Sequence, residues 1–215
     1  MILIFEHYRP NDSERIAELD GTFKANVELG IFEDVVPVSN GDERLRYGQV
    51  FRMCAERYPR RVCVLANSDI QFNHTARLLE GAVAEPKRFV TLTRWESPAT
   101  PRMVGQYKGE RFYSGSQDVW AFVGGELVGI GDRIPLGYIG CDNAIAGEAM
   151  EAGYSVVNPA LSIRTLHNHK GTGRAEGEMS VTGTYAYPEL TTMAVTGRLV
   201  HHPWPQEGAD AQRDA

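Results

Sequence analysis

The sequence predicts a single α/β domain in which a mainly parallel sheet is flanked by helices. Two observations predict this class. Short apolar runs rich in β-branched residues alternate with stretches of helical periodicity over roughly the first 95 residues, which is the order of repeated β-α units. These runs end abruptly in polar residues, as expected of strands whose ends border a ligand crevice. Because connections between parallel strands are right-handed, this order predicts a doubly wound sheet.

The first β-α unit occupies the start of the chain. Residues 2–5 form an apolar run that predicts the first strand. Residues 11–13, Asn-Asp-Ser, are typical helix caps, so a helix is expected over residues 14–26. Three apolar side chains recur at helical spacing on one face of this helix: Ile16, Leu19 and Phe23.

The next unit leads to the segment around which the chain is organised. The expected elements are a strand over residues 31–38, a helix over residues 45–58 and a buried strand over residues 62–66. Asn67, Ser68 and Asp69 follow this buried strand directly, so we expect them at the mouth of a site. The alternative role for Asp69 is to cap the next helix or turn.

The second half of the chain contains longer loops. A helix is expected over residues 75–84 and a strand over residues 88–95. Residues 96–115 are interrupted by prolines and glycines, so we expect a mobile excursion over the site. The remaining expected elements are strands over residues 116–123, 154–158 and 161–166, a glycine-rich loop over residues 124–140 and a helix over residues 144–152.

The composition is that of an ordinary globular protein. The chain has 215 residues, of which 42% are hydrophobic and 23% charged, which is enough to bury a core. No apolar run reaches the ~20 residues of a membrane span, and the start lacks the features of a signal peptide, so a cytoplasmic protein is expected. Residues 203–215 have the composition of a disordered tail, which leaves residues 1–202 as the domain.

Charge and cysteine content exclude further classes. The net charge of −6 disfavours non-specific nucleic-acid binding. The three cysteines lack Cys-x-x-Cys spacing, so free thiols are expected rather than disulfides or a zinc ribbon.

Five motifs, each weak alone, occur together in one order. They are Asn67-Ser68-Asp69, Leu92-Thr93-Arg94-Trp95, Ser116-Gln117-Asp118-Val119-Trp120, Gly140-Cys141-Asp142-Asn143 with Gly153-Tyr154, and His167-Asn168-His169. In this order they resemble the glycosyltransferases of the GT-A fold, and most of all small bacterial and viral members. The likeness covers roughly residues 1–175. It implies a GT-A-like, Rossmann-like domain that moves a sugar from a nucleotide-sugar, with a UDP-sugar expected, to a hydroxyl acceptor.

The resemblance also implies a divalent-metal site. Asn67-Ser68-Asp69 is similar to the family's Asp-x-Asp motif, in which a carboxylate holds a cation against the donor's diphosphate. Here Asn67 replaces the first Asp, so the amide is expected to contact the donor's ribose and the metal to rest on Asp69. His167 corresponds to a late histidine that reaches the same metal, and His169 is a near alternative. Mg²⁺ or Mn²⁺ suits such oxygen ligands, and an imidazole ligand favours Mn²⁺. An ordinary structural role is the alternative for either histidine.

Asp142 corresponds to the acid that acts as general base in inverting members of the family. A helix N-terminus stabilises a carboxylate's charge, and a cleft can tune its pKa. The alternative is a plain helix cap, a role that Asn143 would fill equally well. Asp118, an unusual residue for a strand, competes for the role of base or binds a sugar hydroxyl.

Other residues are expected to bind the donor. Tyr8 and Arg9 follow the first strand, where GT-A enzymes receive the base and ribose, and Ser68 belongs to the same donor set. Arg94, Lys170 and Arg174 would offset the charge of the departing diphosphate. Lys170 and Arg174 belong to a glycine-rich segment that either closes over the nucleotide or is a solvated loop.

The sequence therefore predicts a metal-dependent, inverting glycosyltransferase. Two alternatives stay open. One is a metal-dependent phosphoesterase that uses Asp69, Asp142, His167 and His169. The other is a non-catalytic module that binds sugar-nucleotides or glycans, and the replacement at Asn67 is its best support. The sequence does not fix the sugar, the acceptor or the oligomeric state.

Overall fold

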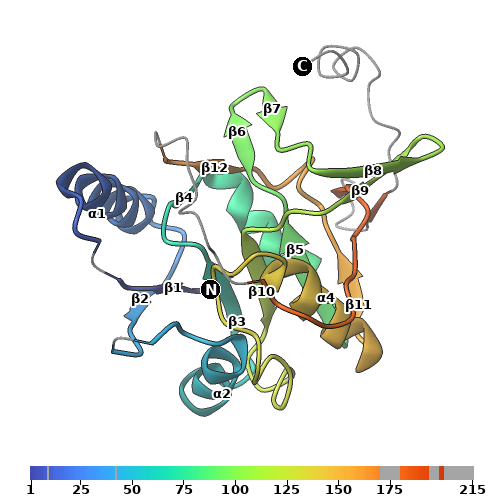
Figure 1. Ribbon diagram of the computed structural model, residues 1–215, viewed down its shortest axis with the longest axis horizontal. Helices are drawn as coiled ribbons and strands as arrows, with labels where there is room; N and C mark the ends of the chain where they lie inside the picture. The colour runs from blue at the N-terminus through green and yellow to red at the C-terminus, as the bar shows by residue number, and fades with distance from the viewer. Residues whose placement is uncertain (9, 42, 170–179, 194–198, 201–215) are drawn as a thin grey trace.

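The computed structural model describes residues 1–8, 10–41, 43–169, 180–193 and 199–200. Its centre is a six-stranded sheet in the order β11-β5-β10-β3-β1-β2 (Figure 1). The strands are β1 (Ile2–Glu6), β2 (Asp34–Val38), β3 (Val62–Ala66), β5 (Arg88–Leu92), β10 (Val119–Val123) and β11 (Ser155–Val157). β1 pairs in parallel with β2 and β3, and β11 pairs in parallel with β5. The α/β class is confirmed, but the sheet is mixed because β10 runs antiparallel to both of its neighbours.

The reversal of β10 decides which residues meet at the functional edge of the sheet. Val119, the first residue of β10, pairs with Ala66 at the end of β3 and with Leu92 at the end of β5. Residues that precede β10 therefore lie at the same edge as residues that follow β1, β3 and β5.

Helices cover both faces of this sheet. They are α1 (Ser13–Glu28), α2 (Tyr47–Arg57), the 3₁₀ helix η1 (His74–Leu78), α3 (Leu79–Ala82) and α4 (Cys141–Glu151). Successive side chains of a strand point to opposite faces, so Ile4 packs in one core while Leu3 packs in the other. α2 and α4 supply Phe51 and Ile145 to the first core, and α3 supplies Leu79 to the second.

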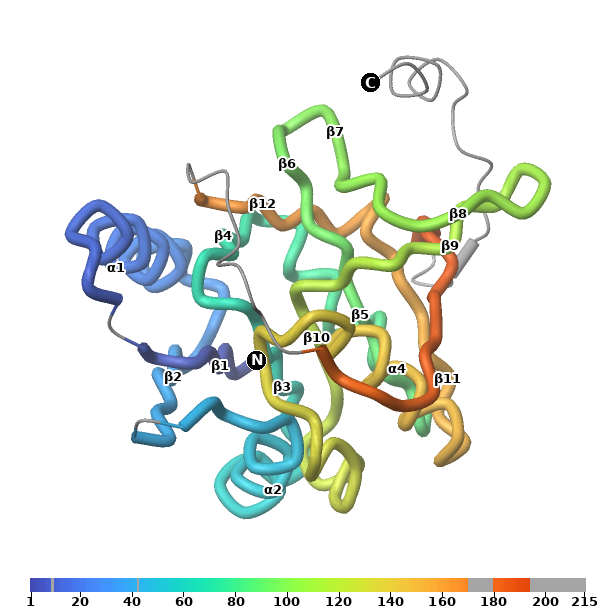
Figure 2. Tube along the Cα trace, viewed as in Figure 1, coloured from blue at the N-terminus to red at the C-terminus, as the bar shows by residue number. Residues whose placement is uncertain are grey.

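A second, smaller sheet lies beside the first. Its strands are β4 (Ile70–Phe72), β12 (Thr165–His167), β6 (Trp95–Ser97) and β7 (Thr100–Pro101), in the order β4-β12-β6-β7. Figures 1 and 2 show these strands at the top of the view, with α1 at the left and α2 at the bottom. Two hairpins complete the fold: β8 (Gly105–Lys108) with β9 (Arg111–Ser114), and β13 (Thr192–Met193) with β14 (Leu199–Val200).

Residues 96–115 differ from the prediction of an irregular excursion. They contain β7, β8, β9 and part of β6. Phe112 is buried in the second core, and its carbonyl accepts a hydrogen bond from Leu190 N (2.8 Å). Pro98 and Gly109 lie in the turns of the two hairpins, whereas Pro101 and Gly105 belong to β7 and β8.

Three other predicted elements have different bounds. The strand expected over residues 88–95 is divided into β5 and β6, because Thr93 N bonds to the Asn158 side chain (3.2 Å) instead of continuing the ladder. The helix expected over residues 75–84 is η1 followed by the short α3, and the strand expected over residues 161–166 is β12 alone.

Two predictions from composition can be compared with the structure. All three cysteines are free thiols, as predicted, and all three are buried. No helix among the described residues is long and apolar enough to cross a bilayer.

Candidate active site

The polar residues at the end of β3 fasten it to the surrounding elements. Asn67 Nδ2 donates to Asp118 Oδ1 (2.9 Å), and Ser68 Oγ donates to the carbonyl of Glu6 at the end of β1 (2.5 Å). Asp69 contacts α1 and β12. The next helical segment is capped by Asn73, so Asp69 does not serve as its cap.

Asp69 belongs to a cluster of charged and imidazole side chains centred on Arg15. Arg15 Nη2 donates to Asp69 Oδ2 (2.6 Å), and Arg15 Nη1 lies 2.6 Å from His169 Nδ1 and 3.1 Å from Glu18 Oε2. His167 Nε2 lies 3.3 Å from Asp69 Oδ2, and His169 Nδ1 lies 3.1 Å from Glu18 Oε2. The structure thus brings together the three residues predicted as metal ligands, Asp69, His167 and His169.

The charges in this cluster stabilise one another in a largely buried place. The side chains of Arg15 and Asp69 are 17% and 13% exposed. Burial alone would raise the pKa of Asp69, but hydrogen bonds from His167 and Arg15 outweigh it and hold that pKa well below its usual range. Burial likewise opposes the charge of Arg15, but its bonds to Asp69 and Tyr8 outweigh this and raise its pKa. Both groups are therefore ionised at neutral pH.

The described side chains do not form a ready site for a divalent cation. A metal site needs several oxygen or nitrogen ligands that converge on one point. Here the guanidinium of Arg15 occupies the space between Asp69, His169 and Glu18, so a cation already stands among the expected ligands. In the part of the chain that the structure describes, no three His, Cys, Asp or Glu side chains are grouped to hold a metal. Metal dependence therefore stays a prediction.

Asp118 is the centre of a second ion-pair network. Its side chain is 6% exposed, and its Oδ1 accepts from Arg94 Nη1 and from Asn67 Nδ2, both at 2.9 Å. Arg94 Nε also donates to Glu96 Oε1 (3.1 Å), and Glu96 reaches His167 Nδ1 (3.4 Å), which links the two networks. Burial opposes the charge of Arg94, but Asp118 and Glu96 outweigh this and raise its pKa. Because the Asp118 carboxylate is already bonded to Arg94 and Asn67, this geometry favours a role in positioning these neighbours.

Asp142 lies in the first turn of α4. The N-cap of α4 is Gly140, in the left-handed region at φ 78°, so the capping alternative for Asp142 is wrong. Its Oδ2 instead accepts from the backbone N of Gln117, just before β10 (2.9 Å). Asn143 ties α4 to the same segment, because its Nδ2 donates to the carbonyl of Gly115 (3.0 Å).

The environment of Asp142 suits a proton acceptor. Burial raises the pKa of Asp142 from 3.8 to about 6, the bond from Gln117 N opposes this rise, and the negative charge of Asp118 adds to it. A base whose pKa lies near the working pH is efficient, because it is mostly ionised and still holds a proton well.

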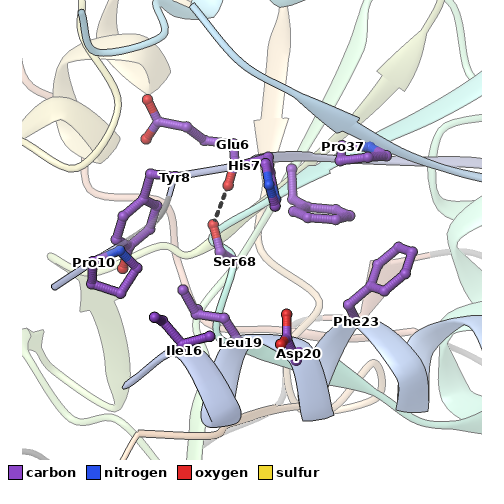
Figure 3. A pocket seen from close by; sticks show the side chains of 11 residues that line it. Glu6, His7, Tyr8, Pro10, Ile16, Leu19, Asp20, Phe23, Pro37 and Ser68 are labelled. Atoms are coloured by element: carbon purple, nitrogen blue, oxygen red, sulfur yellow. Dashed lines mark hydrogen bonds between the residues drawn. The ribbon is translucent and has the colours of Figure 1, made fainter. Parts of the chain in front are cut away.

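An open pocket lies between the end of β1 and helix α1. Its volume is about 260 Å³, just below the ~300–1,000 Å³ common for small-molecule sites. The residues that line it are Phe5, Glu6, His7, Tyr8, Pro10, Ile16, Leu19, Asp20, Phe23, Pro37 and Ser68. In Figure 3, side chains of α1 point across the pocket toward Tyr8, His7 and Pro37. Ile16, Leu19 and Phe23, the predicted apolar face of α1, therefore line a pocket instead of the core.

A different face of α1 attaches the helix to the fold. Asn26 is buried, and its side chain donates to the carbonyl of Ile70 and accepts from Phe72 N, both at 2.9 Å. At this edge of β4, the Asn26 side chain thus pairs the backbone groups that a neighbouring strand would otherwise bond. Because polar Asn26 holds the helix, the apolar stripe is left open to a ligand.

Some site residues were not predicted, and some predicted residues are not described. Arg15, Glu18 and Glu96 were missed, although Arg15 and Glu18 lie three apart just after a clear helix cap, where an ion pair on one face is expected. The predicted donor-binding residues Arg9, Lys170 and Arg174 lie outside the described residues. Trp95 and Trp120 are both buried in the core, so neither presents a ring face to a ligand.

Comparisons with known proteins add little to this picture. No protein-family model and no curated protein matches the sequence. One solved structure with a related arrangement is described as "Crystal structure of a glycosyltransferase involved in the glycosylation of the major capsid of PBCV-1". It is 15% identical, with a TM-score of 0.45, over 81% of this chain and 95% of that chain. A likeness this distant carries no functional argument.

Proposed function

We propose that this protein is a glycosyltransferase that moves a sugar from a nucleotide-sugar, with a UDP-sugar as the expected donor, to a hydroxyl acceptor. The observation that carries the proposal is that three features of a transferase site lie at one edge of the sheet. The residues after β1, β3 and β5 and those before β10 gather a nucleoside-sized pocket, a cluster of fixed charges and a buried carboxylate with a raised pKa. Transfer from a nucleotide-sugar requires these three parts.

The pocket supplies the place for the base and ribose. Phe5 and Phe23 have their rings 5.6 Å apart, and Tyr8 lies at the same rim, so aromatic surface is available to an aromatic base. The hydroxyl of Tyr8 contacts Arg15 (3.3 Å), which connects the base pocket to the charged cluster. A nucleotide whose base enters the pocket would therefore present its phosphates toward Arg15.

Arg15 is the group we assign to the diphosphate. A guanidinium has five donors in a planar fork that matches phosphate oxygens. Its charge is now shared between Asp69 and Glu18, so an incoming diphosphate has to take over some of these contacts. Positive charge placed where the leaving group gains negative charge lowers the barrier to its departure.

Asp142 is the group we assign to the acceptor. It takes the proton of the acceptor hydroxyl as that oxygen bonds to the anomeric carbon and the bond from this carbon to the diphosphate oxygen breaks. Attack from the face opposite the leaving group inverts the anomeric configuration, and no covalent intermediate with the protein is formed. With a pKa of about 6, Asp142 is mostly ionised at pH 7 and ready to accept.

The test is product analysis with a panel of nucleotide-sugars and hydroxyl acceptors. We expect release of a nucleoside diphosphate together with a glycosylated product of inverted configuration, and loss of both with Asp142→Asn. Hydrolysis of the donor without a glycosylated product would support the phosphoesterase alternative. Binding without turnover over the whole panel would support the non-catalytic module.

The contacts of Asp142 weigh against the phosphoesterase alternative. That alternative needs Asp142 beside Asp69 and the two histidines. Asp142 bonds instead to Gln117 N, the residue before Asp118. No described contact joins it to either histidine, so these residues do not form one metal-dependent centre.

A further inference from the structure

A second cavity, of about 460 Å³, has no part in the proposed steps of sugar transfer. It is lined by Glu43, Arg44, Arg46, Arg133, Pro135 and Tyr138. Three arginines around one cavity are unexpected in a chain with a net charge of −6. Such a lining concentrates positive potential in a hollow, which favours an anionic ligand.

The arginines are held by a paired backbone. Residues 44–47, which lead into α2, run beside residues 133–136. Leu136 N donates to Leu45 O (2.8 Å), and Tyr47 N donates to Ile134 O (3.1 Å). Leu45 and Ile134 are both buried, so the residues on either side of each point the other way, toward the cavity. The burial of Leu45 and Ile134 thus directs Arg44, Arg46 and Arg133 toward the cavity.

Charge is available in this cavity for a ligand. Arg44 is paired with Glu6 (3.1 Å). Arg46 and Arg133 have no ion pair with any residue that the structure describes. Among the described residues of the lining, Glu43 is the one acidic residue. Arginine forks bind phosphate and carboxylate groups in a bidentate manner, so two unpaired guanidiniums form a suitable receptor for an oxyanion.

The cavity lies next to both halves of the proposed reaction but is separate from the nucleoside pocket. In Figure 3 the carboxylate of Glu6 points away from that pocket, and this carboxylate holds Arg44. Arg44 also lies over the Tyr8 ring, 5.5 Å from its centre, so Glu6 and Tyr8 form a wall between the two hollows. On the other side, the carbonyl of Tyr138 accepts from Cys141 N, the residue before Asp142 (3.1 Å).

We propose that this cavity binds a phosphate or carboxylate group of the acceptor, so that the protein glycosylates an anionic acceptor. The assignment to the acceptor, as distinct from the binding of an oxyanion, rests on the proposed glycosyl transfer. A molecule anchored by Arg46 and Arg133 lies beside the loop that enters α4 and can present a hydroxyl to Asp142. The donor keeps the pocket on the other side of Tyr8.

The test measures oxyanion binding by isothermal titration at low ionic strength with the full chain. The probes are glucose 6-phosphate, glucuronate and, as the uncharged control, glucose. We expect at least one of the two anions to bind and glucose not to bind. Arg46→Gln and Arg133→Gln should each weaken the anion's affinity about tenfold, the typical effect of a lost charge-assisted hydrogen bond. Arg52→Gln is the matched control, because Arg52 is an exposed arginine of α2 that is paired with Asp132 outside the cavity.

Repeating the titration with UDP separates the acceptor from the donor. The anion should bind as well with saturating UDP as without it, and UDP should bind the wild type, Arg46→Gln and Arg133→Gln equally. Competition between UDP and the anion would overturn the proposal, because the arginines would then hold the donor's diphosphate. Anion binding that is absent, or unchanged in both cavity variants, would overturn it as well. If UDP fails to bind at all, the proposed transferase fails while the oxyanion site is judged by the first titration alone.

Discussion

Asp142→Asn should make the protein more stable at neutral pH while removing its activity. In the native protein Asp142 has a pKa of about 6 in place of 3.8. Each factor of ten in a proton equilibrium is worth about 1.4 kcal/mol, so ionising this buried group costs about 3 kcal/mol of folding free energy. Asparagine carries no charge and can still accept the bond from Gln117 N through its side-chain oxygen.

The sign of the pH dependence follows from the raised pKa. Between pH 3.8 and 6 the folded chain holds the Asp142 proton more tightly than the unfolded chain does, so stability falls as the pH rises through this window. Asp142→Asn has no ionisable group at this position, so its stability does not fall for this reason. Urea unfolding should therefore find Asp142→Asn more stable than the wild type by about 3 kcal/mol at pH 8 and by only about 1 kcal/mol at pH 4.5.

Activity should change in the opposite direction. Turnover of the wild type should rise with pH through a midpoint near 6, and Asp142→Asn should lower it by ~10²- to 10⁴-fold without weakening donor binding. A stability difference that is the same at both pH values would refute the buried-carboxylate reasoning. Full turnover in the variant would refute the role as base, even if the stability result holds.

Three further predictions test other parts of the site. Phe23→Ser should weaken UDP binding about tenfold or more in a titration. Val27→Ser, one turn further on α1 and outside the pocket, is the control and should leave UDP binding unchanged. Equal effects of the two substitutions would mean that the pocket is not the base site. Arg15→Met should weaken UDP binding in the presence of a chelator, whereas the control Lys24→Met, at an exposed lysine, should leave it unchanged. Recovery of UDP binding by Arg15→Met on addition of Mn²⁺ would favour the metal predicted from the sequence. Asn67→Asp should destabilise the fold by roughly 1–3 kcal/mol in urea unfolding at pH 8 and by less at pH 4.5, because it replaces a donor to Asp118 by a second carboxylate. An unchanged urea midpoint of unfolding at pH 8 would contradict this.

The sequence predicted the elements that periodicity controls. β1, β2, β3 and α1 lie close to their predicted positions because apolar runs and the Asp12 cap are local signals. The direction of β10 is not local. Its apolar pattern is the same for a parallel or an antiparallel neighbour, so only the assembled sheet shows that residues 116–118 reach the same edge as residues 67–69.

The site was predicted in part for the same reason. Asp69, His167 and His169 were expected to lie near one another at this edge, and His167 contacts both Asp69 and the ring of His169. Their predicted role as ligands of one metal stays a prediction. Arg15 was missed because an arginine in the first turns of an amphipathic helix is commonly a solvated residue. Its role depends on Asn26, which attaches α1 to β4 and so sets the direction in which Arg15 points. That attachment joins segments far apart in the sequence.

The two halves of the proposed reaction share one chain of contacts. Asn67, two residues from Asp69, donates to Asp118, and Asp118 follows directly on Gln117, whose backbone N bonds to Asp142. The negative charge of Asp118 also contributes to the raised pKa of Asp142. A change that moves Asp118, such as the arrival of a ligand charge at Arg94, would therefore alter the strength of the base as well as the geometry around Asp69. In the proposed reaction, the buried pair of Asp118 and Arg94 would couple the donor side of the site to the acceptor side.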